Sequence, residues 1–136
     1  MTIFQGLFDK DISDDKILDA LSAVFGISRK QIFLTYDIYQ IKIELDDVEL
    51  LCEKAIARGN FRHTITLYLR SNNLRQVGYR EQNIFSQLCN WFNCGCLISD
   101  NSPNPDTMIL IKNNAIKNVS LIPEDSDNEI YNIVGH

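Results

Sequence analysis

Histidine and the sequence patterns of common catalytic sites are scarce in this chain. Only His63 and His136 are present, and no G-x-S-x-G, P-loop, G-x-G-x-x-G or H-E-x-x-H pattern occurs. His63 stands on the apolar side of a predicted strand, where a hydrogen-bonded structural imidazole is more common than a catalytic one. The sequence therefore favours a protein that is not an enzyme. An enzyme that uses His63 or a carboxylate pair is the third interpretation that we carry forward.

A complete set of metal ligands is also missing. Cys89, Cys94 and Cys96 lie close together in the sequence, and His63 could add a fourth ligand. Structural zinc sites usually combine two C-x₂₋₄-C knuckles, and the second knuckle is absent here. Cys89 also lies among the apolar residues of a predicted helix, which favours packing in the core. We therefore expect reduced thiols, no metal and no cofactor.

The sequence shows neither a membrane span nor an export signal. No apolar run approaches the ~20 residues that a membrane helix needs. The first residues lack a basic region, a long apolar region and a cleavage site of small residues. These features predict a cytoplasmic protein without a membrane partner. A length of 136 residues, of which 45% are hydrophobic and 23% charged, predicts one compact domain over residues 1–136.

Charge is present in blocks of one sign. Residues 1–53 hold eleven acids and five bases, residues 54–80 hold six bases and no acid, and residues 81–136 hold seven acids and two lysines. The net charge of −5 argues against nucleic acid as the partner, because affinity for nucleic acid comes mostly from Lys and Arg. Blocks of one sign create fields that steer charged partners. The likelier partner is therefore a basic protein.

Five acids without an intervening base form the strongest candidate for partner binding. They are Glu44, Asp46, Asp47, Glu49 and Glu53. Such a cluster repels itself, and a cationic partner would relieve that cost. Two alternatives stay open: the cluster is a solvated surface, or its members pair with arginines of the basic block on neighbouring strands. The acids of residues 124–129 fit the same argument less strongly.

Two amphipathic helices are predicted from apolar spacing. One covers residues 14–25, with Ser13 or Asp14 as N-cap and Gly26 just after its end. The other covers residues 80–92 and ends at Asn93; its buried stripe is predicted to contain Ile84, Leu88, Trp91 and Phe92.

The remaining elements are predicted strands and loops. Strict alternation predicts strands over residues 39–45 and 62–70, and apolar runs indicate further strands at 31–36, 96–99, 107–112, 115–122 and, at an edge, 130–134. Loops are expected at residues 71–77, 100–106 and 124–129. Residues 47–58 fit either a helix or a strand that turns at Arg58-Gly59-Asn60, and we favour the hairpin slightly. Together these elements predict an α+β fold with a mainly antiparallel sheet packed by the two helices.

Part of the chain resembles bacterial immunity proteins of contact-dependent growth inhibition and other polymorphic toxin systems. The resemblance rests on turn and core residues in the C-terminal two thirds: Leu51-Cys52, Gly59-Asn60-Phe61, Ile65 to Leu69, Cys94 to Asp100, Asn104-Pro105 and Met108 to Ile111. It implies a cytoplasmic inhibitor, not an enzyme, that binds one cognate toxin domain, often a nuclease, and blocks it. No toxin-contacting residue follows from these motifs, because they carry no chemistry.

Two non-enzymatic functions are consistent with this sequence. We favour an immunity protein whose acidic residues 44–53 face a basic toxin domain. The alternative is a type III secretion chaperone, which is also small, acidic and α+β and which works as a dimer. The sequence fixes neither the oligomeric state nor the activity of the toxin.

Overall fold

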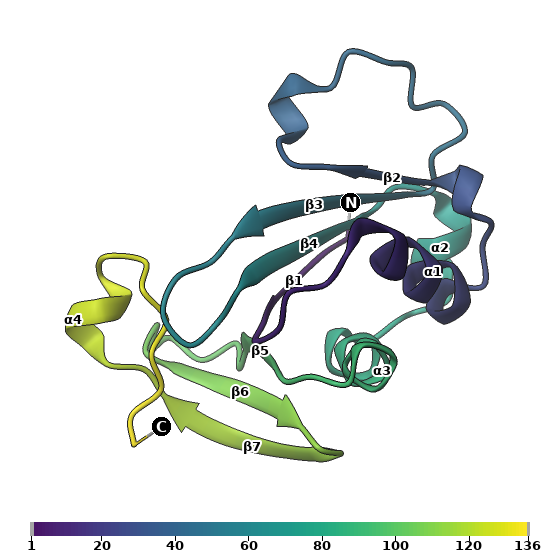
Figure 1. The fold of residues 1–136 in the computed structure, drawn as a ribbon. Helices are drawn as coiled ribbons and strands as arrows, with labels where there is room; N and C mark the ends of the chain where they lie inside the picture. Colours follow the sequence, from purple (N-terminus) through teal and green to yellow (C-terminus); the bar gives the residue numbers. More distant parts are fainter. Residues whose placement is uncertain (1, 136) are drawn as a thin grey trace.

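A seven-stranded, mostly antiparallel sheet forms the centre of the computed structural model, which describes residues 2–135 (Figure 1). The strand order is β2-β3-β4-β1-β5-β6-β7. The strands are β1 (Thr2–Phe8), β2 (Ile32–Thr35), β3 (Leu50–Ile56), β4 (His63–Leu69), β5 (Cys96–Ser99), β6 (Thr107–Lys112) and β7 (Ala115–Ser120). The helices are α1 (Asp14–Phe25), α2 (Asn72–Gln76), α3 (Glu81–Phe92) and α4 (Pro123–Ser126). The predicted α+β fold is confirmed.

Helices α1 and α3 pack against one face of the sheet and form the larger core with it (Figure 1). The ends of α1 are as predicted: the Ser13 hydroxyl accepts the Lys16 N–H at 3.3 Å, and Gly26 follows in the left-handed region at φ 66°. Asn93 ends α3 at φ 52°, also as predicted. Placing Trp91 in the buried stripe was wrong, because its side chain is 57% exposed.

The central strand β1 is not predicted by the sequence pattern. It lies between β4 and β5 and pairs antiparallel with both. Phe4, Leu7 and Phe8 are buried, which places apolar contacts on both faces of this strand. Gly6 lies against α3, where an added Cβ atom would come within 2.8 Å of a Phe85 ring carbon.

The hairpin predicted across residues 47–70 is confirmed, and the helical alternative is wrong. Strands β3 and β4 pair antiparallel over their whole length, with Leu50 opposite Leu69 and Ile56 opposite His63. The turn between them contains Gly59 at φ 95°, a conformation that glycine adopts without strain.

The strand predicted over residues 39–45 is wrong. Residues 38–40 form a 3₁₀ turn instead, and Tyr39 is 89% exposed. The physical reason is the parallel pairing of β2 with β3. A parallel pair needs a long connection, and residues 36–49 provide it. We call residues 36–49 the acidic arm.

Three smaller predictions need correction. Residues 71–77 contain a helical turn, α2, because the Ser71 hydroxyl caps the Leu74 N–H and the Leu74 side chain is buried. The loop expected at residues 124–129 begins as the helical turn α4, with Pro123 in its first turn. Residues 130–134 form isolated bridges, Gly59 to Tyr131 and Leu121 to Ile133, instead of an edge strand. The remaining predicted strands are confirmed. Asn113 and Asn114, both with positive φ, form the turn between β6 and β7.

Candidate protein-binding site

The acidic arm projects beyond β2 (Figure 1). It carries large side chains that are exposed. Tyr36 is 64% exposed, Tyr39 is 89% exposed and Ile43 is 58% exposed. Exposed tyrosines beside an aliphatic side chain are typical of binding surfaces, because they bury much area at little entropic cost.

The structure divides the five predicted partner-binding acids into two groups. Glu44, Asp46 and Asp47 are exposed on the arm. Glu49 and Glu53 are half-buried and already accept hydrogen bonds within the protein. Three acids are therefore free for a partner, and two serve the fold.

The two half-buried carboxylates hold both ends of the arm. Glu53, on β3, accepts the Ile38 N–H at 3.0 Å and the Tyr68 hydroxyl at 3.4 Å. Burial and the Glu53 charge raise the pKa of Tyr68, so its hydroxyl keeps the proton that it donates. At the other end, Glu49 accepts from the Gln31 side-chain amide at 2.6 Å.

Arg70 anchors the returning part of the arm. Its Nη1 atom donates to the Leu45 carbonyl at 2.7 Å and to the Val48 carbonyl at 2.9 Å. Its own backbone N–H donates to the Glu49 carbonyl at 2.8 Å. Hydrogen bonds from Arg70 therefore fix the backbone of the segment that carries the exposed acids Asp46 and Asp47.

In the part of the chain that the structure describes, the acidic cluster of residues 44–53 does not pair with the arginines of the basic block. Within residues 2–135, no ion pair joins an acid of residues 44–53 to an arginine of residues 54–80. Lys54 contacts Asp14 at 3.1 Å instead and donates to the Ile12 carbonyl at 2.7 Å. The exposed acids of the arm are therefore not neutralised by the arginines of residues 54–80.

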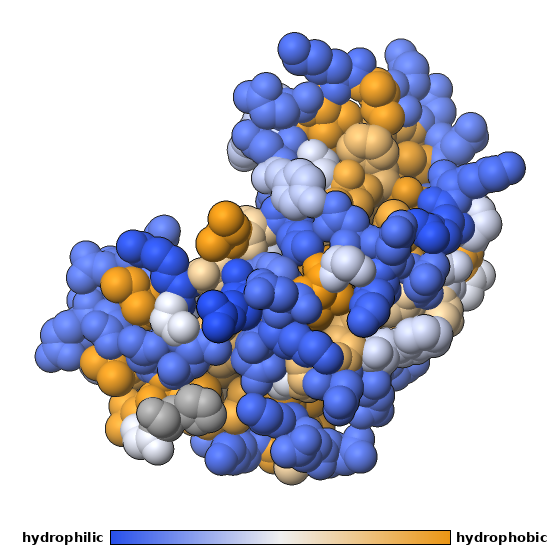
Figure 2. Space-filling view, viewed as in Figure 1, coloured by the Kyte–Doolittle hydropathy of each residue, from blue (hydrophilic) through white to orange (hydrophobic). Residues whose placement is uncertain are grey.

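A second acidic segment lies across a hollow from the arm. Figure 2 shows the surface hollowed between the arm at the top and the segment around α4 at the left. Residues 124–129 hold four acids and no base, and Arg58 fixes this segment through the Asn128 carbonyl. Strand β3 ends between the two segments with Ile56, which is 90% exposed (Figure 1). Segments that contain several acids therefore border this hollow on two sides.

His63 has a structural role. It is 7% exposed, and its Nε2 atom accepts the Ile12 N–H at 3.0 Å, just before α1 begins. Burial lowers the pKa of His63, and the nearby Lys54 charge lowers it further. The neutral imidazole therefore fixes the chain between β1 and α1.

Acid should destabilise the protein partly through His63. Because the folded-state pKa lies below the ordinary value of 6.5, this contribution to the free energy of unfolding is complete above pH 6.5 and is lost as the pH falls through the lowered pKa. The variant His63→Gln can still accept from Ile12 but does not titrate. Urea unfolding of both proteins from pH 7.5 to pH 5 should show a steeper loss for the wild type. Parallel curves would contradict this role.

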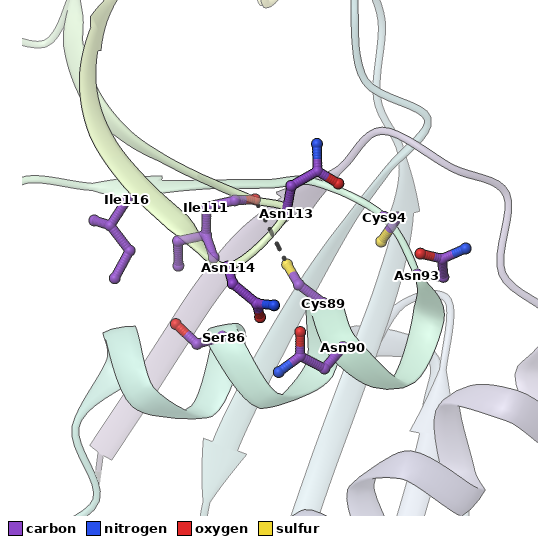
Figure 3. A pocket seen from close by; sticks show the side chains of 9 residues that line it. All are labelled: Ser86, Cys89, Asn90, Asn93, Cys94, Ile111, Asn113, Asn114 and Ile116. Atoms are coloured by element: carbon purple, nitrogen blue, oxygen red, sulfur yellow. Dashed lines mark hydrogen bonds between the residues drawn. The ribbon is translucent and has the colours of Figure 1, made fainter.

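Cys89 and Cys94 line a surface cavity of about 390 Å³ between α3 and the β6–β7 hairpin (Figure 3). The Cys89 thiol lies 3.8 Å from the Ile111 carbonyl. The neighbouring Cys89 thiol and burial both raise the pKa of Cys94, which keeps it protonated. Within the described residues, no group of three or more His, Cys, Asp or Glu side chains is arranged to hold a metal ion.

Comparison of the chain with protein-family models, with curated proteins and with solved structures finds no match. Over residues 2–135, none of the helices combines the length and the apolar character that crossing a bilayer requires.

Proposed function

We propose that this protein is an immunity protein, which neutralises a cognate basic toxin domain by binding it through the acidic arm. The observation that carries the proposal is the combination of three exposed acids, Glu44, Asp46 and Asp47, with the exposed side chains of Tyr39 and Ile43 on one anchored segment. The resemblance of residues 51–111 to immunity proteins of polymorphic toxin systems agrees with this function.

The two kinds of side chain would act at different stages of binding. Exposed acids raise the association rate with a cationic surface, and salt screens this effect over ~10 Å at about 0.1 M. Tyr39 and Ile43 would become buried in the complex and slow its dissociation, since well-packed aromatic anchors carry most of an interface's energy. A toxin nuclease presents a basic cleft for phosphates, and the carboxylates of the arm can occupy it.

The test is stopped-flow binding to the cognate toxin domain, which this proposal expects to be the C-terminal domain of a large secreted protein encoded next to this gene. The triple variant Glu44→Gln, Asp46→Asn, Asp47→Asn should associate about tenfold more slowly at low salt, with a smaller difference at high salt. Tyr39→Ala should weaken binding by about 2 kcal/mol, mainly through faster dissociation. These variants leave Glu49 and Glu53 in place, so the arm keeps its anchors.

A control variant changes the same charge elsewhere. Asp11→Asn, Asp15→Asn, Asp19→Asn removes three exposed acids that lie outside the arm, on or just before α1; Asp15 and Asp19 pair with Arg29. It should affect association much less than the arm variant does. If the two triple variants slow association equally, net charge alone explains the effect of the arm acids. If Tyr39→Ala changes neither the association rate nor the dissociation rate, the arm is not part of the interface.

A further inference from the structure

Strand β7 forms an edge of the sheet and presents unpaired backbone groups. The two-residue turn Asn113-Asn114 makes Lys112 and Ala115 a hydrogen-bonded pair. Because such pairs alternate along an antiparallel ladder, Lys117 and Val119 also bond to β6. Ile116, Asn118 and Ser120 therefore turn their N–H and C=O groups outward.

The C-terminal segment confirms this orientation and covers only one end of the edge. The Val134 N–H donates to the Ser120 carbonyl at 2.8 Å. Within the described residues, no hydrogen bond outside the ladder reaches the backbone of Ile116 or Asn118. Ile116 is 49% exposed. The edge is thus open over the part of β7 nearest the turn.

Surface hollows accompany β7 on both faces of the sheet. On the helix face, the cavity of Figure 3 borders Ile116 and is lined by neutral polar side chains, including Asn90 and Asn114. On the opposite face, hollows of about 260 Å³ and 330 Å³ both border Lys117. A strand added to β7 would point its side chains alternately toward these two sets of hollows.

The charge of this hairpin is opposite to that of the whole protein. Residues 107–120 contain Lys112 and Lys117 and no acid. Lys112 pairs with Asp9 at 3.1 Å, whereas Lys117 takes part in no ion pair within residues 2–135. A second copy of this chain is a poor occupant, because a two-fold axis normal to the sheet at the middle of β7 would bring Lys117 close to its own copy.

We propose that the open edge of β7 binds an extended segment of a partner protein as an eighth strand, with an acidic side chain of that segment facing Lys117. Backbone bonds to Ile116 and Asn118 supply affinity, and the charge of Lys117 selects the segment. The side chains next to this acid in the segment point to the other face, where the neutral cavity beside Ile116 accepts an uncharged group. This surface is separate from the acidic arm, so it does not depend on the proposed function.

The test uses two synthetic peptides, acetyl-Thr-Val-Thr-Glu-Thr-Val-Thr-amide and the same peptide with Lys in place of Glu. Titration to millimolar concentration, followed by amide NMR of the full chain, should shift Ile116 and Asn118 and slow their hydrogen exchange. The Glu peptide should bind about fivefold more tightly than the Lys peptide. Lys117→Glu should reverse this preference.

Two further variants separate edge binding from other causes. Asn118→Pro removes an outward N–H without removing a ladder bond, and it should abolish the shifts. Asn118→Thr should preserve them. If Asn118→Pro fails to fold, the reversal by Lys117→Glu decides alone. Absence of binding, shifts on the arm instead of β7, or self-association of the free chain through β7 would overturn the proposal.

Discussion

Replacing Gly6 with alanine should lower the free energy of unfolding by about 2–3 kcal/mol, although only one methyl group is added. The new Cβ atom would lie 2.7 Å from the Cys96 Sγ atom and 2.8 Å from a Phe85 ring carbon. Cys96 and Phe85 are fully buried, so neither can move into solvent. Urea unfolding at pH 7 measures the loss. Ile3→Ala, at a 54% exposed position of the same strand, is the control and should cost much less.

A double variant tests whether the clash is the cause. Cys96→Ala alone should destabilise the protein by leaving a small cavity, but in the Gly6→Ala background it removes the sulfur that the new methyl group meets. The double variant should therefore lose less stability than the two single variants added together. Strict additivity would show that the contact with the Cys96 sulfur is not the cause of the loss, which would leave the contact with the Phe85 ring.

The sequence predicted those elements whose caps, apolar periods or turn residues lie within the element itself or directly beside it. Helix α1 carries its own cap and its own apolar period, and the β3–β4 hairpin carries a turn glycine between two runs of strand-forming residues. Strand β1 lacks such a signal. It contains Gly6 and is stabilised by partners about sixty and ninety residues away in the sequence, so only the tertiary pairing makes it a strand.

The error at residues 39–45 of the acidic arm is the reverse: the sequence predicts a strand that does not form. Tyr39, Ile41, Ile43 and Leu45 alternate as in a half-buried strand, but they belong to the connection between the parallel strands β2 and β3 and join no strand of the sheet. A period-two pattern cannot reveal whether a segment pairs with a neighbouring strand. Tyr39 and Ile43, which the alternation predicts on a buried face, are therefore exposed.

The candidate site was predicted in part. The charge pattern identified the acids as candidates, because a run of acids without bases usually lies exposed on the surface. It could not separate Glu44, Asp46 and Asp47, which are exposed, from Glu49 and Glu53, which bond to groups just before β2, on the arm and on β4. The same limit applies to Arg70: its carbonyl partners on the arm depend on the path of the connection, which the sequence did not predict.

Replacing Arg70 with alanine should both destabilise the protein and loosen the arm. The change leaves the carbonyls of Leu45 and Val48 without their donor, and hydrogen bonds from a charged group contribute about 1.5–3 kcal/mol each when sheltered. Since Arg70 is only half-buried, we expect a total loss of about 2 kcal/mol in the free energy of unfolding. Amide hydrogen exchange at Ile38 and Val48 should accelerate by more than global unfolding explains.

The control for Arg70→Ala is Arg75→Ala, which makes the same change in net charge. Arg75 is exposed, and its side chain bonds only to Asn72 within the described residues. Arg75→Ala should leave both the stability and the exchange rates of the arm almost unchanged. If the two variants behave alike, Arg70 does not hold the arm.

Arg70→Ala also tests whether the arm contributes to binding through its charge alone or also through its ordered conformation. Each of the two arginine variants makes the protein more negative by one charge, so electrostatic steering alone predicts faster association with a basic toxin domain for both. An ordered arm that presents Tyr39 and Asp46 together predicts weaker binding for Arg70→Ala only, because a loosened arm must be ordered again in the complex at an entropic cost. Binding measured with the three proteins at equal salt distinguishes these outcomes. Tighter binding of Arg70→Ala would mean that the arm contributes charge without a defined shape.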